Sequence, residues 1–229
     1  MQNNKIRYVA LGDCVTLGAP LQQGQAYPER VAAAMGWQVT NYGHTMSTTR
    51  EALQYFKKLD VQQADVLSIQ YGIVDSWQTF KGAPFVLYYP DTPWRKLLRK
   101  LVKKIKKYGR KLNLHRLFGT ANVVPVEEYI ANIQYMIQHA QAKYILLPEV
   151  YPHQDLTREP RILAYNQALA QLHDGKRVFV IKHFDLLKPH LYSDYYDDAT
   201  HLSGRGHQAL ASHIVAELKV FLRSDDLSL

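Results

Sequence analysis

Five short apolar runs punctuate this chain, and segments with helical periodicity separate them. They predict strands over residues 7–11, 38–42, 64–70, 144–147 and 178–181. The third run is apolar almost throughout, which is typical of a strand covered on both faces of a parallel sheet. Strands that alternate with helices in this way predict a three-layer α/β/α fold with right-handed crossovers.

Capping residues and apolar periodicity predict the helices between the strands. Expected helices cover residues 27–36, 48–58, 125–140, 157–172 and 206–221. A chain of 229 residues is long enough for one domain with a sizeable core, so we predict a single domain over residues 1–229. Residues 81–118 interrupt the strand–helix rhythm and are interpreted as an insertion.

The first predicted strand stops at Gly12-Asp13, where the chain must turn, and the next residue is Cys14, the only cysteine. A nucleophile on the turn after a strand lies at the edge of the sheet, where a substrate can reach it. The alternative is that Cys14 is a small buried apolar residue, as many free cysteines are.

Near the other end, Asp198 and His201 form an Asp-x-x-His sequence. This spacing lets the carboxylate fold back onto the imidazole, hold one tautomer and stabilise the imidazolium, while the second ring nitrogen faces a nucleophile. His207 has no carboxylate three residues before it, and we interpret it as structural.

Together the two ends resemble the SGNH, or GDSL-type, hydrolase family. Its first block is Gly-Asp-Ser with a glycine four residues after the serine, and here it reads Gly12-Asp13-Cys14 with Gly18. Its last block is Asp-x-x-His, which Asp198 and His201 match. The resemblance implies a flavodoxin-like parallel five-stranded sheet, with Cys14 as nucleophile, His201 as base and then acid, and Asp198 as the orienting carboxylate.

Two further family blocks lie between these ends. Asn41-Tyr42-Gly43 fits the glycine after the second strand, and Gly72-Ile73-Val74-Asp75 fits the Gly-x-Asn-Asp block except at Val74. The resemblance implies an oxyanion hole from the backbone N–H groups of Cys14 and Gly43, since glycine allows close approach to the backbone. Asp13, Gly72, Val74 and Asp75 are expected to line the site, with Asp13 accepting backbone hydrogen bonds at its turn.

Two departures from the family bear on activity. Cysteine in place of serine would give a thioester, which passes its acyl group readily to an acceptor, and an imidazole beside the thiol is expected to ease its ionisation. Val74 cannot donate the hydrogen bond that the family's asparagine supplies. Gln70, Asn41 or His44 could replace that donor, the oxyanion could be held differently, or the site could be non-catalytic.

The predicted insertion is strongly basic, with eleven Lys or Arg and no acidic residue between Arg95 and Arg116. A helix capped by Asp91-Thr92-Pro93 and ended by Gly109 is expected there, with apolar residues on one face and cations on the others. From Trp94 to Lys107 the pattern is that of a helix lying on an anionic membrane or binding an acidic glycan. The alternative is a helix whose apolar face packs on the body of the protein.

These observations give two functional hypotheses. The first is an acyl ester or thioester hydrolase or acyltransferase with a Cys14–His201–Asp198 triad, acting on an acylated small molecule, a surface polysaccharide or a lipid-linked glycan. The second is a non-catalytic binding protein on the same scaffold. No cofactor, metal or nucleic acid is expected, because metal-ligand spacing and phosphate loops are absent from the sequence. The single cysteine and the lack of an apolar leader suggest a cytoplasmic protein, peripheral at the inner membrane face.

Overall fold

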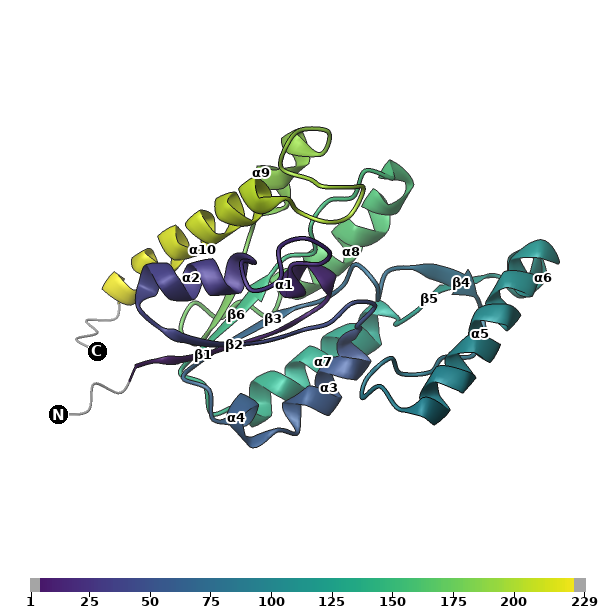
Figure 1. Cartoon of the computed structure of the whole chain (residues 1–229), viewed down its shortest axis with the longest axis horizontal. Coiled ribbons are helices and arrows are strands. Elements are labelled where there is room, and N and C mark those ends of the chain that lie inside the picture. Colours follow the sequence, from purple (N-terminus) through teal and green to yellow (C-terminus); the bar gives the residue numbers. More distant parts are fainter. Residues whose placement is uncertain (1–4, 225–229) are drawn as a thin grey trace.

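The computed structural model describes residues 5–224, and its centre is one parallel sheet (Figure 1). The strand order is β2-β1-β3-β6-β7. The strands are β1 (Arg7–Gly12), β2 (Gln38–Gly43), β3 (Val66–Gln70), β6 (Tyr144–Pro148) and β7 (Val178–Ile181). The predicted three-layer, flavodoxin-like fold is therefore confirmed, and all five expected strands are present within two residues of their predicted bounds.

The register of the sheet aligns the ends of its three neighbouring strands. Gly12 of β1 lies beside Gly43 of β2 and beside Gln70 of β3. Parallel strands present their carboxyl ends at one edge, where ligands of such sheets bind. Residues that follow β1, β2 and β3 therefore start from the same edge.

Helices cover both faces of the sheet. Figure 1 shows α2 (Tyr27–Met35) and α10 (Gly204–Ser224) together on one face, with α3 (Thr49–Phe56) and α7 (Val126–His139) on the other. The helix α8 (Glu159–Ala170) packs on α7 through an edge-to-face contact of Tyr165 with Tyr129. Short helical segments complete the body: α1 (Cys14–Leu17), α4 (Leu59–Gln62), η1 (Leu156–Arg158), α9 (Phe184–Leu187) and η2 (Lys188–His190). The helix α1 begins at the turn predicted after Gly12-Asp13.

The insertion projects from the body at the right of Figure 1. Its base is a two-stranded antiparallel ribbon, β4 (Gln78–Phe80) and β5 (Thr120–Asn122), which the sequence analysis did not predict. Between them lie α5 (Pro93–Lys111) and α6 (Leu114–Phe118). The insertion thus starts and ends a few residues outside the predicted 81–118.

Gly109 does not end the basic helix, contrary to expectation, because α5 continues to Lys111. Gly109 is buried against β4, where a Cβ atom would lie 2.6 Å from the Phe80 ring. Its role is to let the helix approach the ribbon closely, which local sequence does not reveal.

Candidate active site

Cys14 is the first residue of α1, directly after β1. The N-cap is Asp13, whose Oδ1 accepts the Val15 N–H at 3.0 Å, and the turn closes at Gly18 in the left-handed conformation. Only 6% of the Cys14 surface is exposed. The predicted strand–turn placement of Cys14 is confirmed, and so is the expected role of Asp13 as a turn carboxylate.

Asp13 is completely buried beneath this turn. Its Oδ1 also accepts a hydrogen bond from the Tyr151 hydroxyl at 3.0 Å, while Oδ2 has no partner among the described residues. Burial raises the pKa of this carboxyl to about 7, although the two hydrogen bonds favour its ionised form.

The environment of the Cys14 thiol disfavours ionisation. Burial, followed by the charge of Asp13, raises the pKa of Cys14 above its ordinary value, and the Tyr151 hydroxyl acts in the opposite direction. Within residues 5–224 no hydrogen bond joins Cys14 to His201. The expectation that a neighbouring imidazole makes this thiol ionise readily is wrong for this arrangement, because the thiol is enclosed and lacks that partner.

Asp198 and His201 are brought together as their spacing predicts. His201 Nδ1 lies 2.7 Å from Asp198 Oδ2, and the His201 backbone N–H donates to Asp198 Oδ1 at 2.8 Å. Burial acts to raise the pKa of Asp198, but the hydrogen bonds from His201 and Thr200 outweigh it and lower that pKa. The carboxylate thus fixes the ring through Nδ1 and leaves Nε2 for other chemistry.

Tyr151 and His153 connect these two parts of the site, and the sequence analysis missed both roles. The Tyr151 hydroxyl contacts Asp13, whereas His153 Nε2 lies 3.0 Å from the Thr200 hydroxyl, inside the Asp-x-x-His loop. Two residues of extended chain span only about 7 Å, so the segment after β6 holds the Cys14 turn and the His201 loop close to each other. The sequence signal for these two residues is their position just after a predicted strand, where ligands of such sheets bind.

The predicted oxyanion hole is only partly available. The Gly43 N–H donates to Asn41 Oδ1 at 2.8 Å, so the prediction that this N–H is free to bind a substrate oxygen is wrong for this structure. Glycine is required at this position for packing, because a Cβ atom there would lie 2.2 Å from the Leu17 nitrogen. The Cys14 N–H is the remaining backbone candidate.

The side chains considered as replacement donors are also engaged or enclosed. Asn41 Nδ2 donates to the Thr16 carbonyl and to Glu29. Gln70 Oε1 accepts from Thr16, whereas its donor nitrogen Nε2 is buried and has no hydrogen-bond partner among the described residues. His44 stacks between Tyr55 and Tyr89, and burial lowers its pKa to about 4, so the ring is neutral. Of the three candidates only Gln70 keeps an amide donor without a partner, and this donor is enclosed.

Gly72, Val74 and Asp75 follow β3 at the same edge. Gly72 has φ 128°, and a Cβ atom there would lie 2.2 Å from Val150. Val74 is 4% exposed and lines a pocket, whereas Asp75 is fully buried. Asp75 Oδ1 accepts the N–H and the hydroxyl of Thr49 at 2.9 and 2.7 Å, which makes Asp75 a structural partner of α3.

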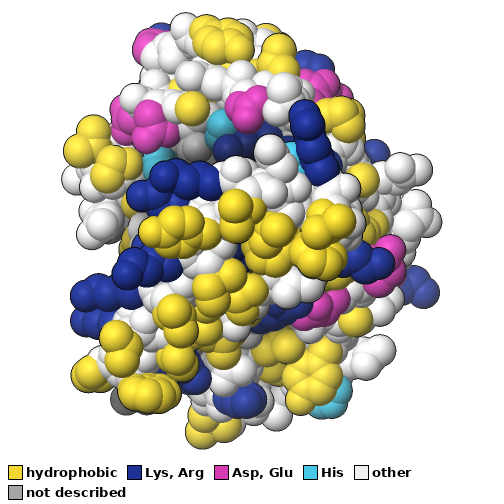
Figure 2. Space-filling view, turned by 90° about the vertical axis from the view of Figure 1, so that its right-hand side faces the viewer, with side chains coloured by type: hydrophobic (Ala, Val, Ile, Leu, Met, Phe, Trp, Pro, Cys, Tyr) yellow, Lys and Arg dark blue, Asp and Glu magenta, His cyan; other side chains and the backbone are white. Residues whose placement is uncertain are grey.

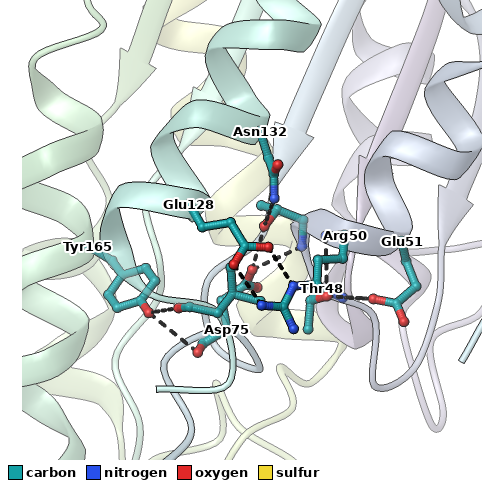
Figure 3. Close-up of polar contacts among 9 residues, drawn as sticks. Thr48, Arg50, Glu51, Asp75, Glu128, Asn132 and Tyr165 are labelled. Atoms are coloured by element: carbon teal, nitrogen blue, oxygen red, sulfur yellow. Dashed lines mark hydrogen bonds and ion pairs between the residues drawn. The ribbon is translucent and has the colours of Figure 1, made fainter. Parts of the chain in front are cut away.

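A polar network beside Asp75 attaches the insertion to the body (Figure 3). Glu51 is buried and accepts the Thr48 N–H at 2.9 Å as part of a capping box, and its other oxygen accepts the Tyr88 N–H at 2.7 Å. Arg50 forms a two-pronged ion pair with Glu128 and lies over the Phe85 ring. The start of α3 therefore holds both α7 and the loop that leads into α5.

A pocket of about 690 Å³ lies between the body and the insertion. Met46 and Val74 line its body side, and Phe80, Phe85 and Val102 are among its apolar walls. Cations from α5 also line it, namely Arg99, Lys103, Lys106, Lys107 and Arg110. Cys14, Asp198 and His201 are not among the lining residues.

Residues 5–224 contain neither a metal-binding cluster nor a membrane-spanning helix. Residues 5–224 contain no cluster of three or more His, Cys, Asp or Glu side chains able to hold a metal ion. In the same range no helix has the length and apolarity needed to cross a membrane.

The model of the GDSL-like lipase/acylhydrolase family matches residues 10–209. The chain belongs to this family. Its match extends from β1 into α10, so it includes Cys14, Asp198 and His201, and it supports ester hydrolysis as the activity of this GDSL-like protein. Curated proteins gave no match.

Solved structures with this fold include several hydrolases. A G-D-S-L family lipolytic protein from Desulfitobacterium hafniense superposes with a TM-score of 0.62 at 13% identity, covering 93% of this chain and 99% of its own. A lipase/acylhydrolase from Enterococcus faecalis gives 0.60 at 20% identity, with 94% and 96% covered. An acetylxylan esterase from Geobacillus stearothermophilus gives 0.61 at 17% identity, with 94% of each chain covered. At these identities the likeness shows the shared fold.

Proposed function

We propose that this GDSL-like protein is an acyl ester hydrolase or acyltransferase with Cys14 as nucleophile, His201 as general base and acid, and Asp198 as the orienting carboxylate. The observation that carries the proposal is the 2.7 Å contact between His201 Nδ1 and Asp198 Oδ2, which leaves Nε2 as the proton acceptor. Cys14 follows β1 on the turn that faces the same edge of the sheet.

The proposed reaction has two stages, formation of a thioester on Cys14 and transfer of its acyl group. Cys14 Sγ attacks the ester carbonyl carbon while His201 Nε2 takes the thiol proton, and the proton then passes to the leaving alkoxide as the C–O bond breaks. The thioester is then attacked by water or by an acceptor hydroxyl, whose proton passes to His201 Nε2. His201 returns this proton to the Cys14 thiolate as the C–S bond breaks. Because Cys14 is buried and no hydrogen bond joins it to His201 within residues 5–224, the proposal requires the thiol and the His201 ring to form this hydrogen bond when substrate binds.

The pocket supports a substrate class. Its apolar walls suit an acyl or lipid chain, and its lysines and arginines suit phosphate or carboxylate groups. We therefore propose an acylated glycan, either a surface polysaccharide or a lipid-linked precursor, and the name of the acetylxylan esterase with the same fold is consistent with a carbohydrate ester. A free thiol nucleophile needs a reducing compartment, which supports a cytoplasmic location.

The test is intact-mass spectrometry after exposure to p-nitrophenyl acetate, in the wild type and in Cys14→Ala, His201→Ala and Asp198→Asn. We expect one acetyl group on Cys14 of the wild type, none in Cys14→Ala, and slow labelling in the other two variants. Labelling of Cys14 that proceeds equally fast without His201 would overturn the triad.

The same experiment decides the second candidate, a non-catalytic binding protein. Three observations favour it: Val74 offers no donor, the Gly43 N–H is already paired, and the Cys14 thiol is enclosed. With the protein folded, absence of both a Cys14 adduct and p-nitrophenol release would support this candidate and exclude the enzyme.

A further inference from the structure

The basic helix α5 turns its apolar face away from the body. Its large apolar side chains are mostly exposed, including Trp94 at 67%, Leu97 at 57% and Leu101 at 54%. Ile105, Tyr108 and Leu112 continue this row at 39%, 55% and 71%, and α6 adds Leu117 and Phe118 at 75% and 54%. We call these eight residues the apolar row.

The opposite expectation, that this face packs on the body, is wrong. The body side of α5 is formed by other residues: Gly109 packs against Phe80, Arg99 donates to the Tyr88 carbonyl, and Lys106 lies over the Phe85 ring. Since contact with the body is already made there, the apolar row stays in solvent, where it is unfavourable unless something covers it.

Exposed cations surround the apolar row. Figure 2 shows this face, on which hydrophobic side chains gather among lysines and arginines. Of the eleven cations between Arg95 and Arg116, only Lys96 and Arg99 form an ion pair with a carboxylate in the described part of the chain, both with Asp91. The other nine cations therefore have no carboxylate partner within residues 5–224.

We propose that α5 and α6 dock this protein on an anionic lipid bilayer, with the apolar row in the interface and the lysines at the headgroups. A helix with Trp and Leu on one face and many lysines beside them is suited to lie in such an interface. A second copy of the chain is disfavoured as the occupant, because the same dense positive charge would face itself. Bilayer docking does not depend on the chemistry proposed for Cys14.

Docking would also place the pocket beside the membrane. α5 separates the apolar row from the pocket, which its inner side lines through Arg99, Val102 and Lys106. A lipid-linked substrate could then present its polar part to the body while its chain remains near the bilayer.

The test is co-sedimentation of the full chain with two kinds of phosphatidylcholine vesicle, one without phosphatidylglycerol and one with about 30 mol% of it. About one anionic lipid in three gives the second kind a strongly negative surface potential. We expect binding to the anionic vesicles only. Lys100→Glu/Lys104→Glu/Lys111→Glu should weaken it by on the order of 100-fold, since each basic residue near such a surface contributes about 1 kcal/mol. The matched control, Lys57→Glu/Lys176→Glu/Lys182→Glu, has the same net charge on exposed sites outside the insertion and should bind nearly as the wild type does.

A second set of measurements separates insertion from adsorption. Trp94 emission should shift to shorter wavelength with anionic vesicles, and the shift should disappear in Trp94→Phe. Leu97→Ser/Leu101→Ser/Ile105→Ser should reduce binding more than Leu21→Ser/Leu59→Ser/Leu156→Ser, whose leucines are also exposed. Equal binding to both vesicle types, or no binding to either, would overturn the proposal. So would a dimer in sedimentation velocity that does not bind vesicles and that the Leu97→Ser/Leu101→Ser/Ile105→Ser variant abolishes.

Discussion

The carboxyl edge of the sheet and the inserted helix α5 differ in which side chains they bury and which they expose. At the edge, Asp13, Glu51 and Asp75 are buried, and each accepts at least two hydrogen bonds from the chain. On α5, by contrast, large apolar side chains are exposed, and within residues 5–224 most cations lack a carboxylate partner. The edge is organised by internal contacts, whereas the exposed outer side of α5 is the basis for the proposed docking on a bilayer.

The largest expected difference between the two regions is catalytic. His201→Ala should lower p-nitrophenyl acetate turnover by about 10²- to 10⁴-fold, because it removes the proposed general base. The Lys100→Glu/Lys104→Glu/Lys111→Glu variant should hydrolyse this small soluble ester at the wild-type rate. Steady-state kinetics on both proteins checks this, and a comparable loss in both would show that the regions are not separable.

A second substitution tests whether a missing hydrogen-bond donor at position 74 limits turnover. Val74→Asn should raise turnover of the same ester by up to about 100-fold, because it restores a donor of the kind whose removal typically costs 10²- to 10³-fold. Val74→Ala is the matched control, since it changes volume without adding a donor. If the alanine variant gains as much as the asparagine variant, space rather than hydrogen bonding limits the reaction.

Stability should differ between the regions as well. Glu51→Ala leaves the Thr48 and Tyr88 N–H groups without their acceptor and should lower the free energy of unfolding by about 1–3 kcal/mol. Leu101→Ser, on the exposed row, should change it by no more than about 0.5 kcal/mol. Urea denaturation measures both, and a large loss for Leu101→Ser would mean that this leucine packs internally.

The last prediction is a pH dependence of stability at the edge. Asp13 has a folded-state pKa of about 7, raised by burial from 3.8, so the folded protein holds this proton more tightly than the unfolded chain. Its contribution is fully present below about pH 4 and is lost as the pH rises through about 7. Unfolding free energies of wild type and Asp13→Asn should therefore differ in slope across this window, and parallel curves would place the Asp13 pKa near its ordinary value.

Features set by neighbours in the chain could be predicted from the sequence. The alternation of apolar runs and helical segments determined the sheet and its layers, because burial on both faces requires continuous apolar strands. The turn at Gly12-Asp13, which carries Cys14, and the pairing of Asp198 with His201 also follow from short-range geometry.

What only the tertiary structure decided rests on contacts between distant segments. The ribbon of Gln78–Phe80 with Thr120–Asn122 pairs strands too short to have a pattern, and Tyr151 reaches Asp13 across 138 positions of the chain. The sequence determined that α5 is amphipathic, but not which way it faces. That direction was decided by Gly109, whose missing side chain lets α5 approach Phe80 and leaves the apolar row in solvent.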